Sequence, residues 1–293
     1  MNYQVTHTTT YQYSDTVDLC YNEARIKPRS FSRQRVLSCR QTISPHPDDY
    51  RERTDFFGNT AAFFSIQKPY RKLVVSVQSE VEVLGNQGRD PLLESISWED
   101  TLQTLASSHD FQTLNARQHT MASPLVPVFA DLNRYARQFV EPGKPVVQVG
   151  RDLMSAIYHD FAYVPGFTTI TTSLHEVMKH RQGVCQDFAH VAIGCLRSLG
   201  LAASYISGYL ETVPPPGQEK LVGADASHAW FTLYVPSWGW VHFDPTNNLI
   251  ADQQHIVCAW GRDYSDIIPL NGVVYSSGQD EIEVSVDVRR LEG

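Results

Sequence analysis

Apolar and polar residues alternate along several short stretches in the first third of the chain. Residues 2–13 and 73–84 show this period of two most clearly, and the runs 35–43 and 61–66 are further candidate strands. Residues with strong turn preference separate the runs. Short strands joined by turns predict an N-terminal β-sandwich domain over residues 1–85.

The apolar spacing becomes helical after a Gly- and Asn-containing segment at residues 85–91. Apolar residues recur at every fourth position from Val149 to Phe161, which predicts one buried helical face. We therefore expect residues 86–150 to form a mainly helical connecting segment.

Two further helices are expected before the chain returns to strands. Ser173 and Glu176 form a capping box, so a helix should start there and end near His180. A second helix should start near Cys185 and end at Gly200, because glycine is a common residue just beyond a helix C-terminus.

Alternating runs at 203–210, 227–235 and 240–244 predict strands, and the tail ends in another at 282–288. A helix packed against an antiparallel sheet makes the fold class α+β. We assign residues 151–293 to this core, C-terminal strands included. The Pro-rich residues 213–225 predict a loop that gates the site.

Composition narrows the class of protein. Hydrophobic residues make up 42% and charged residues 19%, values typical of a soluble globular protein. No apolar run approaches the roughly 20 residues of a membrane helix, and the first residues do not resemble a signal peptide. Five sparse cysteines give no disulfide framework, so we expect a cytoplasmic protein without a membrane partner.

The formal charge of −8 is unevenly distributed. Residues 1–85 hold 11 Lys/Arg against 9 Asp/Glu, whereas residues 86–293 hold 13 against 23. Nucleic-acid binding draws on clustered cations, so the acidic part argues against it. The basic residues between Arg25 and Arg40 are interpreted as a solvated face of the β domain, with an acidic partner as the alternative.

Cys185 is the candidate nucleophile. It lies at a predicted helix N-terminus, where backbone N–H groups and the helix dipole stabilise a thiolate. The remaining cysteines lack this setting and are interpreted as structural: Cys20, Cys39, Cys195 and Cys258.

His228 and Asp244 are candidates for the base and for the group that orients it. The two strands that carry them are joined by a turn at 236–239, so the side chains should be opposite or diagonal neighbours. His242 shares a face with Asp244 and is the alternative base. His190, close to Cys185 in sequence, is interpreted as a packing residue.

Other chemistries find no support in the sequence. His175 and His180 are five residues apart, so they do not share a helical face as zinc ligands do. No Cys-x-x-Cys pair and no phosphate-binding glycine loop occurs. We expect no metal and no nucleotide cofactor, and the lack of a nearby resolving cysteine argues against redox chemistry.

The sequence resembles the bacterial transglutaminase-like superfamily, which includes proposed cysteine proteases. The core resemblance rests on five segments: 183–190 (GVCQDFAH), 207–209 (SGY), 226–230 (ASHAW), 239–240 (GW) and 243–247 (FDPTN). Residues 261–266 (GRDYSD) and the N-terminal segments 23–29 and 55–59 are also similar to this group, so the resemblance covers nearly the whole chain.

This resemblance implies a papain-like core with Cys185 as nucleophile, His228 as base and Asp244 as orienting carboxylate. It implies a thioester intermediate, which water resolves by hydrolysis and an amine by transamidation. The resemblance does not imply a calcium site in this chain. The Cys185 N–H is one candidate oxyanion donor, with Gln182, Gln186 or Tyr163 as a second.

The favoured function is therefore a cysteine protease or amidase that acts on peptide or isopeptide bonds of a peptide or protein substrate. Protein-glutamine crosslinking is the alternative reaction, and a peptide-binding or assembly module without turnover is the alternative class. The sequence does not determine the oligomeric state.

Overall fold

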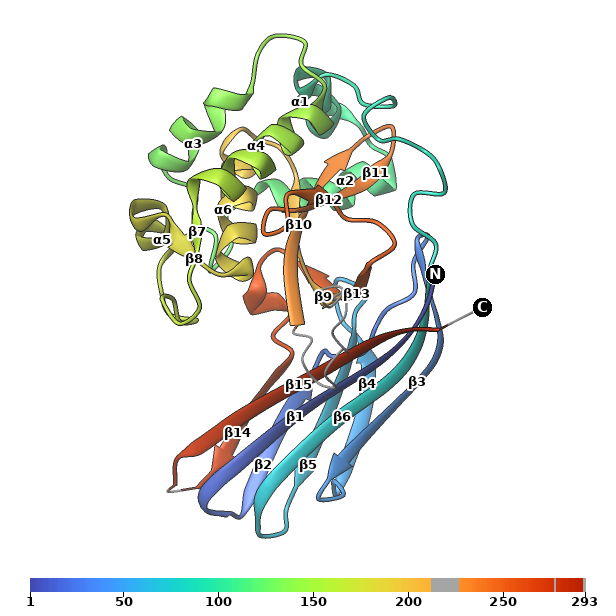
Figure 1. Cartoon of the computed structure of the whole chain (residues 1–293), viewed down its shortest axis with the longest axis vertical. Helices are drawn as coiled ribbons and strands as arrows, with labels where there is room; N and C mark the ends of the chain where they lie inside the picture. The colour runs from blue at the N-terminus through green and yellow to red at the C-terminus, as the bar shows by residue number, and fades with distance from the viewer. Residues whose placement is uncertain (212–226, 277, 292–293) are drawn as a thin grey trace, which may run out of the picture.

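The computed structural model describes residues 1–211, 227–276 and 278–291, and Figure 1 shows a helix-rich part above a β-sandwich. The predicted gate at residues 213–225 lies outside the described residues. Within the described ranges, no helix has the length and apolar character needed to cross a bilayer.

Two four-stranded antiparallel sheets form the sandwich. One has the order β15-β1-β6-β3, with strands Asp280–Leu291, Asn2–Val17, Tyr70–Val83 and Gln34–Ser44. The other has the order β14-β2-β5-β4, with strands Leu270–Tyr275, Leu19–Ala24, Thr60–Ile66 and Asp49–Thr54. Buried side chains of both sheets, such as Phe64, Ile66, Leu73 and Val75, pack between them. The strands predicted at 2–13, 35–43, 61–66 and 73–84 match β1, β3, β5 and β6, whereas β2 and β4 were not predicted.

The two C-terminal strands belong to this sandwich by their hydrogen bonds. Both lie within residues 151–293, the predicted core, but β15 pairs with β1 and β14 pairs with β2. Val286 and Val288 of β15 are buried against Tyr3 and Val5 of β1. The alternation of residues 282–288 predicts a strand, but it does not specify which sheet edge that strand joins.

The connecting segment is mainly helical, and its last helix crosses the predicted boundary at residue 150. It contains α1 (Trp98–Ser107), α2 (Phe111–Arg117), the 3-10 helix η1 (Gln118–Thr120), α3 (Ala130–Ala136), the 3-10 helix η2 (Arg137–Phe139) and α4 (Val146–Asp160). Ser97 and Asp110 cap α1 and α2 by accepting the backbone N–H groups of Asp100 and Thr113. These side chains satisfy donors that a helix N-terminus leaves free.

The third sheet has five strands in the order β12-β11-β10-β9-β13. Their bounds are Leu249–Ile250, Gly239–Asp244, Ser227–Val235, Ala203–Leu210 and His255–Gly261. The prediction of β9, β10 and β11 is confirmed, whereas β12 and β13 were not predicted. The run 255–261 lacks the polar-apolar alternation that indicated the other strands.

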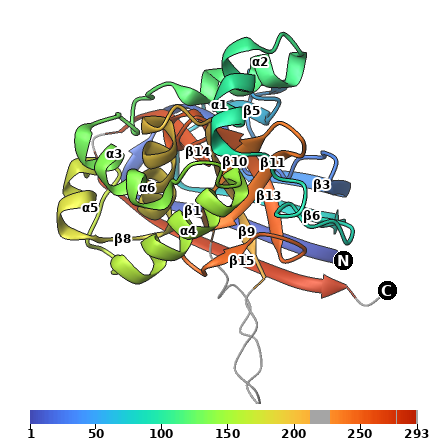
Figure 2. The same cartoon turned by 90° about the horizontal axis from the view of Figure 1, so that it is seen from above.

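Helices cover one face of this sheet (Figures 1 and 2). Helix α6 (Cys185–Ser198) is buried along most of its length and packs on β9 and β10, and α5 (Leu174–His180) packs beside it. The predicted capping box at Ser173 and Glu176 is present. A short parallel pair, β7 (Ala162–Tyr163) and β8 (Gln182–Gly183), precedes α6, and the 3-10 helix η3 (Tyr264–Asp266) follows β13.

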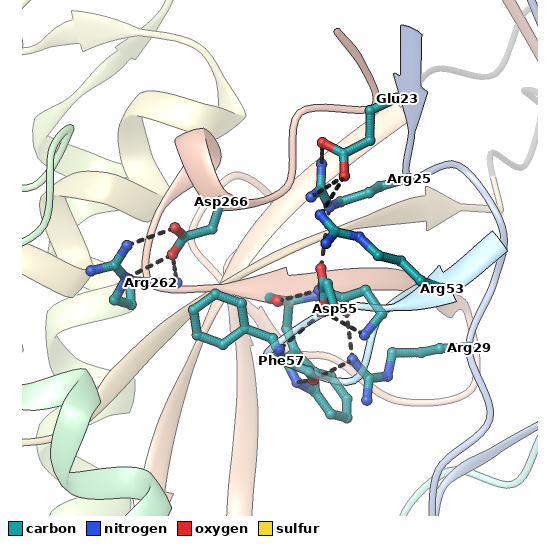
Figure 3. A network of polar contacts seen from close by, with 10 residues as sticks. Glu23, Arg25, Arg29, Arg53, Asp55, Phe57, Arg262 and Asp266 are labelled. Atoms are coloured by element: carbon teal, nitrogen blue, oxygen red, sulfur yellow. Dashed lines mark hydrogen bonds and ion pairs between the residues drawn. The ribbon is translucent and has the colours of Figure 1, made fainter. Parts of the chain in front are cut away.

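A polar network joins the sandwich to the core (Figure 3). Arg29 lies over the ring of Trp260, 3.2 Å from its centroid, and donates to Asn59 Oδ1 at 2.5 Å. Asn59 in turn donates to the Trp260 carbonyl at 2.9 Å. Arg25 pairs with Glu23 and with Asp55. Arg25 and Arg29 of the basic cluster are thus engaged within the protein.

Candidate functional site

Cys185 is the first residue of α6, and its neighbours fix the turn that delivers it. The Asp187 carboxylate accepts the Val184 N–H at 2.8 Å and the Thr168 hydroxyl at 2.6 Å. A Cβ atom on Gly183 would lie 2.7 Å from that carboxylate, so only glycine leaves room for it. The Gly-Val-Cys-Gln-Asp sequence thus encodes a tight, hydrogen-bonded entry into the helix.

The candidate oxyanion donors lie around this entry. Tyr163 pairs with Gly183 across the β7–β8 ribbon, and Gln182 pairs with Ala162. The pKa of Tyr163 is raised by burial, and next by the nearby Cys185 and Asp187. Gln186 directly follows Cys185 on α6 and is partly exposed. The contribution of these side chains to an oxyanion site stays a prediction.

His228 connects the thiol to the carboxylate. Its Nε2 donates to Asp244 Oδ2 at 2.7 Å, which leaves Nδ1 as the ring nitrogen free for Cys185. Burial alone would lower the pKa of His228, but hydrogen bonds with Asp244 and Cys185 outweigh it and raise the pKa to about 10. A protonated imidazole stabilises a thiolate beside it. The structure therefore brings Cys185, His228 and Asp244 together.

Asp244 is fully buried and accepts hydrogen bonds at both oxygens. Oδ1 receives the backbone N–H groups of Thr246 and Asn247 at 3.0 and 3.2 Å. Oδ2 receives His228, the Asn247 amide at 2.7 Å and His255 Nε2 at 3.0 Å. Burial raises the pKa of this carboxyl, but the bonds from His228 and His255 outweigh it and hold the pKa well below the ordinary value. The buried charge is therefore stabilised by donors on every side.

His255 is the residue of this cluster that the sequence analysis missed. It begins β13, it is 4% exposed, and burial lowers its pKa although Asp244 opposes the shift. The ring is thus neutral with its proton on Nε2, and Nδ1 has no partner among the described residues. The available signal was a lone polar residue at the start of the apolar run 255–261. Asn247 belongs to the segment 243–247 (FDPTN) that carries the family resemblance, but the sequence predicts no role for it.

The three side chains His228, Asp244 and His255 also meet the distance criterion for a cation site, since one ligand atom of each lies within 4.8 Å of the others. Both imidazoles, however, lie at hydrogen-bond distance from the same oxygen, 2.7 and 3.0 Å from Asp244 Oδ2. A cation would have to displace these two bonds. The geometry fits a hydrogen-bonded cluster better than a metal centre.

The other histidines considered above lie elsewhere. His242 Nδ1 accepts the indole N–H of Trp230 at 3.1 Å. His190 is buried and accepts the Tyr264 N–H at 3.2 Å, in agreement with the packing role predicted for it. His175 stacks on Phe129 and His180 packs against Phe167, so the two do not converge.

The remaining cysteines differ from Cys185 in setting. Cys20, Cys195 and Cys258 are buried, Cys39 is exposed, and all are free thiols. Burial raises the pKa of Cys195 and Cys258 well above the ordinary value and also raises that of Cys39.

Sequence comparison matches residues 3–82 to the bacterial transglutaminase-like N-terminal region and residues 133–245 to the transglutaminase-like superfamily. An uncharacterized protein of Mycobacterium tuberculosis is 41% identical over 300 residues, which cover 99% of this chain and 93% of that protein. A protein-glutamine gamma-glutamyltransferase of Pseudomonas aeruginosa is 31% identical over 74 residues, which cover 25% of this chain and 11% of that protein.

Among solved structures, that of a proposed cysteine protease from Cytophaga hutchinsonii aligns with a TM-score of 0.75. The alignment covers 100% of this chain and 91% of that chain at 19% identity, so it shows a common fold. The matched fold and the two family matches agree with the arrangement of sandwich, helices and central sheet. The chain belongs to the transglutaminase-like superfamily and carries the bacterial transglutaminase-like N-terminal region.

Proposed function

We propose that the protein is a thiol enzyme that cleaves amide bonds of peptide or protein substrates through Cys185, His228 and Asp244. The observation that carries the proposal is the position of His228 between a helix-terminal thiol and a buried, fully hydrogen-bonded carboxylate. Such an arrangement activates a nucleophile and keeps the imidazole in one orientation.

The reaction follows from the opposite charges of the Cys185 thiolate and the protonated His228 ring. The Cys185 thiolate attacks the amide carbonyl, and His228 gives its proton to the departing amine, which leaves a thioester on sulfur. His228 then accepts a proton from the incoming water or amine, whose attack releases the acid or a new amide. Asp244 holds the imidazole in place and stabilises its positive form through both steps.

Hydrolysis is the favoured second step. Cys185 is partly exposed and Tyr163 beside it is 52% exposed, so among the described residues water has a path to the thioester. The similarity to the Pseudomonas aeruginosa transferase supports amine transfer as the second candidate reaction.

The alkylation of Cys185 by iodoacetamide tests the activated thiol, with N-acetylcysteine as the reference for an ordinary thiol. Peptide mass spectrometry at pH 7 should show Cys185 labelled at least about tenfold faster than N-acetylcysteine, because a thiolate rather than a thiol reacts. His228→Ala should remove this difference in rate, whereas His175→Ala, which changes an exposed histidine away from the site, should keep it. Labelling of Cys185 no faster than N-acetylcysteine would favour a binding module without turnover.

A second measurement separates the two reactions. Casein is incubated with the protein alone or with a dansylated primary amine, and fragments and amine adducts are quantified by mass spectrometry. New peptide termini that Cys185→Ala abolishes support hydrolysis, whereas amine adducts on glutamine support transfer. If the wild-type protein yields neither new peptide termini nor amine adducts, the result would contradict both reactions for casein as the substrate.

A further inference from the structure

A cavity of about 570 Å³ is lined by residues other than Cys185, His228 and Asp244. Its walls come from the sandwich (Phe31, Phe57), from α2 and η1 (Asn115, His119) and from the sheet strands (Trp240). Ligand cavities in proteins commonly measure about 300–1,000 Å³. This space is thus large enough for a small organic molecule.

Aromatic rings form most of the walls. They belong to residues from four separate parts of the chain: Phe31, Phe57, Tyr234 with Trp238 and Trp240, and Trp260. Several are held by ring contacts, since His119 meets Trp240 edge to face at 5.2 Å and Phe31 meets Trp260 in the same way at 5.4 Å. Rings fixed in this manner favour a planar apolar or aromatic body over a flexible chain.

Two side chains of the cavity wall, Arg33 and His242, carry donors that lack acceptors among the described residues. Of the Arg33 nitrogens, Nη2 donates to the Ala251 carbonyl at 2.9 Å, whereas Nε is buried without a partner among the described residues. No carboxylate of the described chain lies within ion-pair distance of Arg33, although Asp252 acts on it from farther away. The guanidinium charge is therefore only partly compensated.

His242 lines the cavity beside Arg33 and presents a second donor. Its Nδ1 already accepts the Trp230 indole N–H, and burial together with the charge of Arg33 holds its pKa well below the ordinary value. The ring is therefore neutral with its proton on Nε2, for which the described residues provide no acceptor. Among the described residues that line the cavity, none is Asp or Glu.

We propose that this cavity binds a small aromatic carboxylic acid, whose carboxylate lies against Arg33 and His242 and whose ring packs between the aromatic walls. A carboxylate supplies the acceptors that both side chains lack, and an anion compensates the arginine charge. The proposal is independent of the chemistry at Cys185.

Binding of 2-naphthoate to the full chain tests this proposal by calorimetry and by saturation-transfer NMR. The wild-type protein should bind 2-naphthoate, and both the neutral 2-naphthamide and the aliphatic octanoate should bind at least tenfold more weakly. Arg33→Gln should weaken 2-naphthoate at least tenfold. Arg35→Gln is the matched control, because Arg35 is a 67% exposed arginine two residues away that pairs with Glu82, and it should leave binding unchanged.

Asn115→Trp provides a second variant should Arg33→Gln fail to fold, because Asn115 is exposed on α2 and a tryptophan there would fill the cavity. It should abolish binding while the thermal unfolding midpoint stays within a few degrees of the wild-type value. Equal affinity for acid and amide, equal weakening by the Arg33 and Arg35 variants, or no binding of 2-naphthoate at millimolar concentration would each overturn the proposal.

Discussion

At the scale of single residues, one oxygen atom of Asp244 joins most of the candidate site. His228, His255 and Asn247 all donate to Oδ2, and the carboxylate is fully buried. Each donor supports the negative charge that keeps His228 protonated. The charge and orientation of His228 therefore depend on residues that do not touch Cys185.

His255→Phe removes one of these donors and keeps the volume of the ring. The pKa of Asp244 should rise, and its Oδ2, with one donor fewer, should hold the His228 proton more tightly and raise the pKa of His228 further, so His228 becomes a weaker acid and the pH profile of activity should shift. We expect an activity loss of roughly tenfold, since a hydrogen bond to a charged group contributes about 1.5–3 kcal/mol. His255→Gln retains a donor and should restore part of the rate. A pH profile identical to that of the wild-type protein would exclude a positioning role for His255.

Asp244→Asn should change the pH dependence of stability with a defined sign. The folded pKa of Asp244 is lowered, so its contribution is present above the unfolded pKa of about 3.9 and is lost as the pH falls. The folded pKa of His228 is raised to about 10, so its contribution is complete below about 6.5 and is lost as the pH rises through the folded value.

Urea unfolding of the wild-type protein and of Asp244→Asn across pH 3–10 measures this difference. The free energy of unfolding of the wild-type protein should exceed that of Asp244→Asn most between roughly pH 4 and 6.5, and the difference should decrease at lower and at higher pH. Its size there should be at least about 2 kcal/mol, the contribution of one hydrogen bond to a charged group. A difference that does not vary with pH would contradict the assigned coupling of the two residues.

The pairing of His228 with Asp244 could be predicted because a short hairpin fixes which residues of two strands face each other. His255 could not be predicted in this way. Its strand, β13, joins the sheet through β9 rather than through β11, and its apolar run gives no period. Long-range strand order places His255 against Asp244, and local pattern does not encode that order.

At the scale of elements, the packing of β9 depends on Gly208. This residue pairs with His228 of β10 and with Val257 of β13. It therefore lies between the two strands that carry His228 and His255, the histidines that bond to Asp244. A Cβ atom on Gly208 would lie 2.1 Å from the Ile256 carbonyl and 2.6 Å from the Trp230 ring. A backbone carbonyl cannot rotate away as a side chain can.

Gly208→Ala should therefore destabilise the protein by at least about 2 kcal/mol, at the upper part of the range for overpacking. It should also lower the rate of Cys185 alkylation, because β10 and β13 must separate. Gly194→Ala in α6 is the control, since its Cβ would meet the movable end of Leu132 at 2.8 Å and alanine favours helix. Chemical denaturation that shows equal losses for both variants would contradict this account of β9.

At the scale of the whole molecule, a shared core joins the sandwich to the central sheet. It combines Tyr3 and Val81 of the N-terminal strands, Tyr209 and Ile256 of the central sheet, and Val286 of β15, with neighbouring residues of each group. Residues from the start, middle and end of the chain are thus buried together. The alternating patterns predicted the strands of Tyr3, Val81, Tyr209 and Val286 but not β13, which carries Ile256, and the common core follows from tertiary contacts.

Val286→Asp places a charge in this shared core, where Val286 is 0% exposed. Both the sandwich and the central sheet should lose stability in one calorimetric transition at a lower temperature, since burial of an unpaired charge costs several kcal/mol. Val284→Asp on the same strand is the control, because Val284 is 50% exposed and should change the midpoint little. Two separate transitions in Val286→Asp, with only one of them shifted, would show that the two parts unfold independently.

The pairing of β1 with β15 has a consequence for biosynthesis. Asn2 pairs with Leu291, so β1 is synthesised long before β15, the strand that covers its edge. Until then the free edges of β1 and β2 are open to other chains, which is a hazard for aggregation. The central sheet is made in the interval, and its contacts with Tyr3 and Val81 cover part of this sheet before β15 is made.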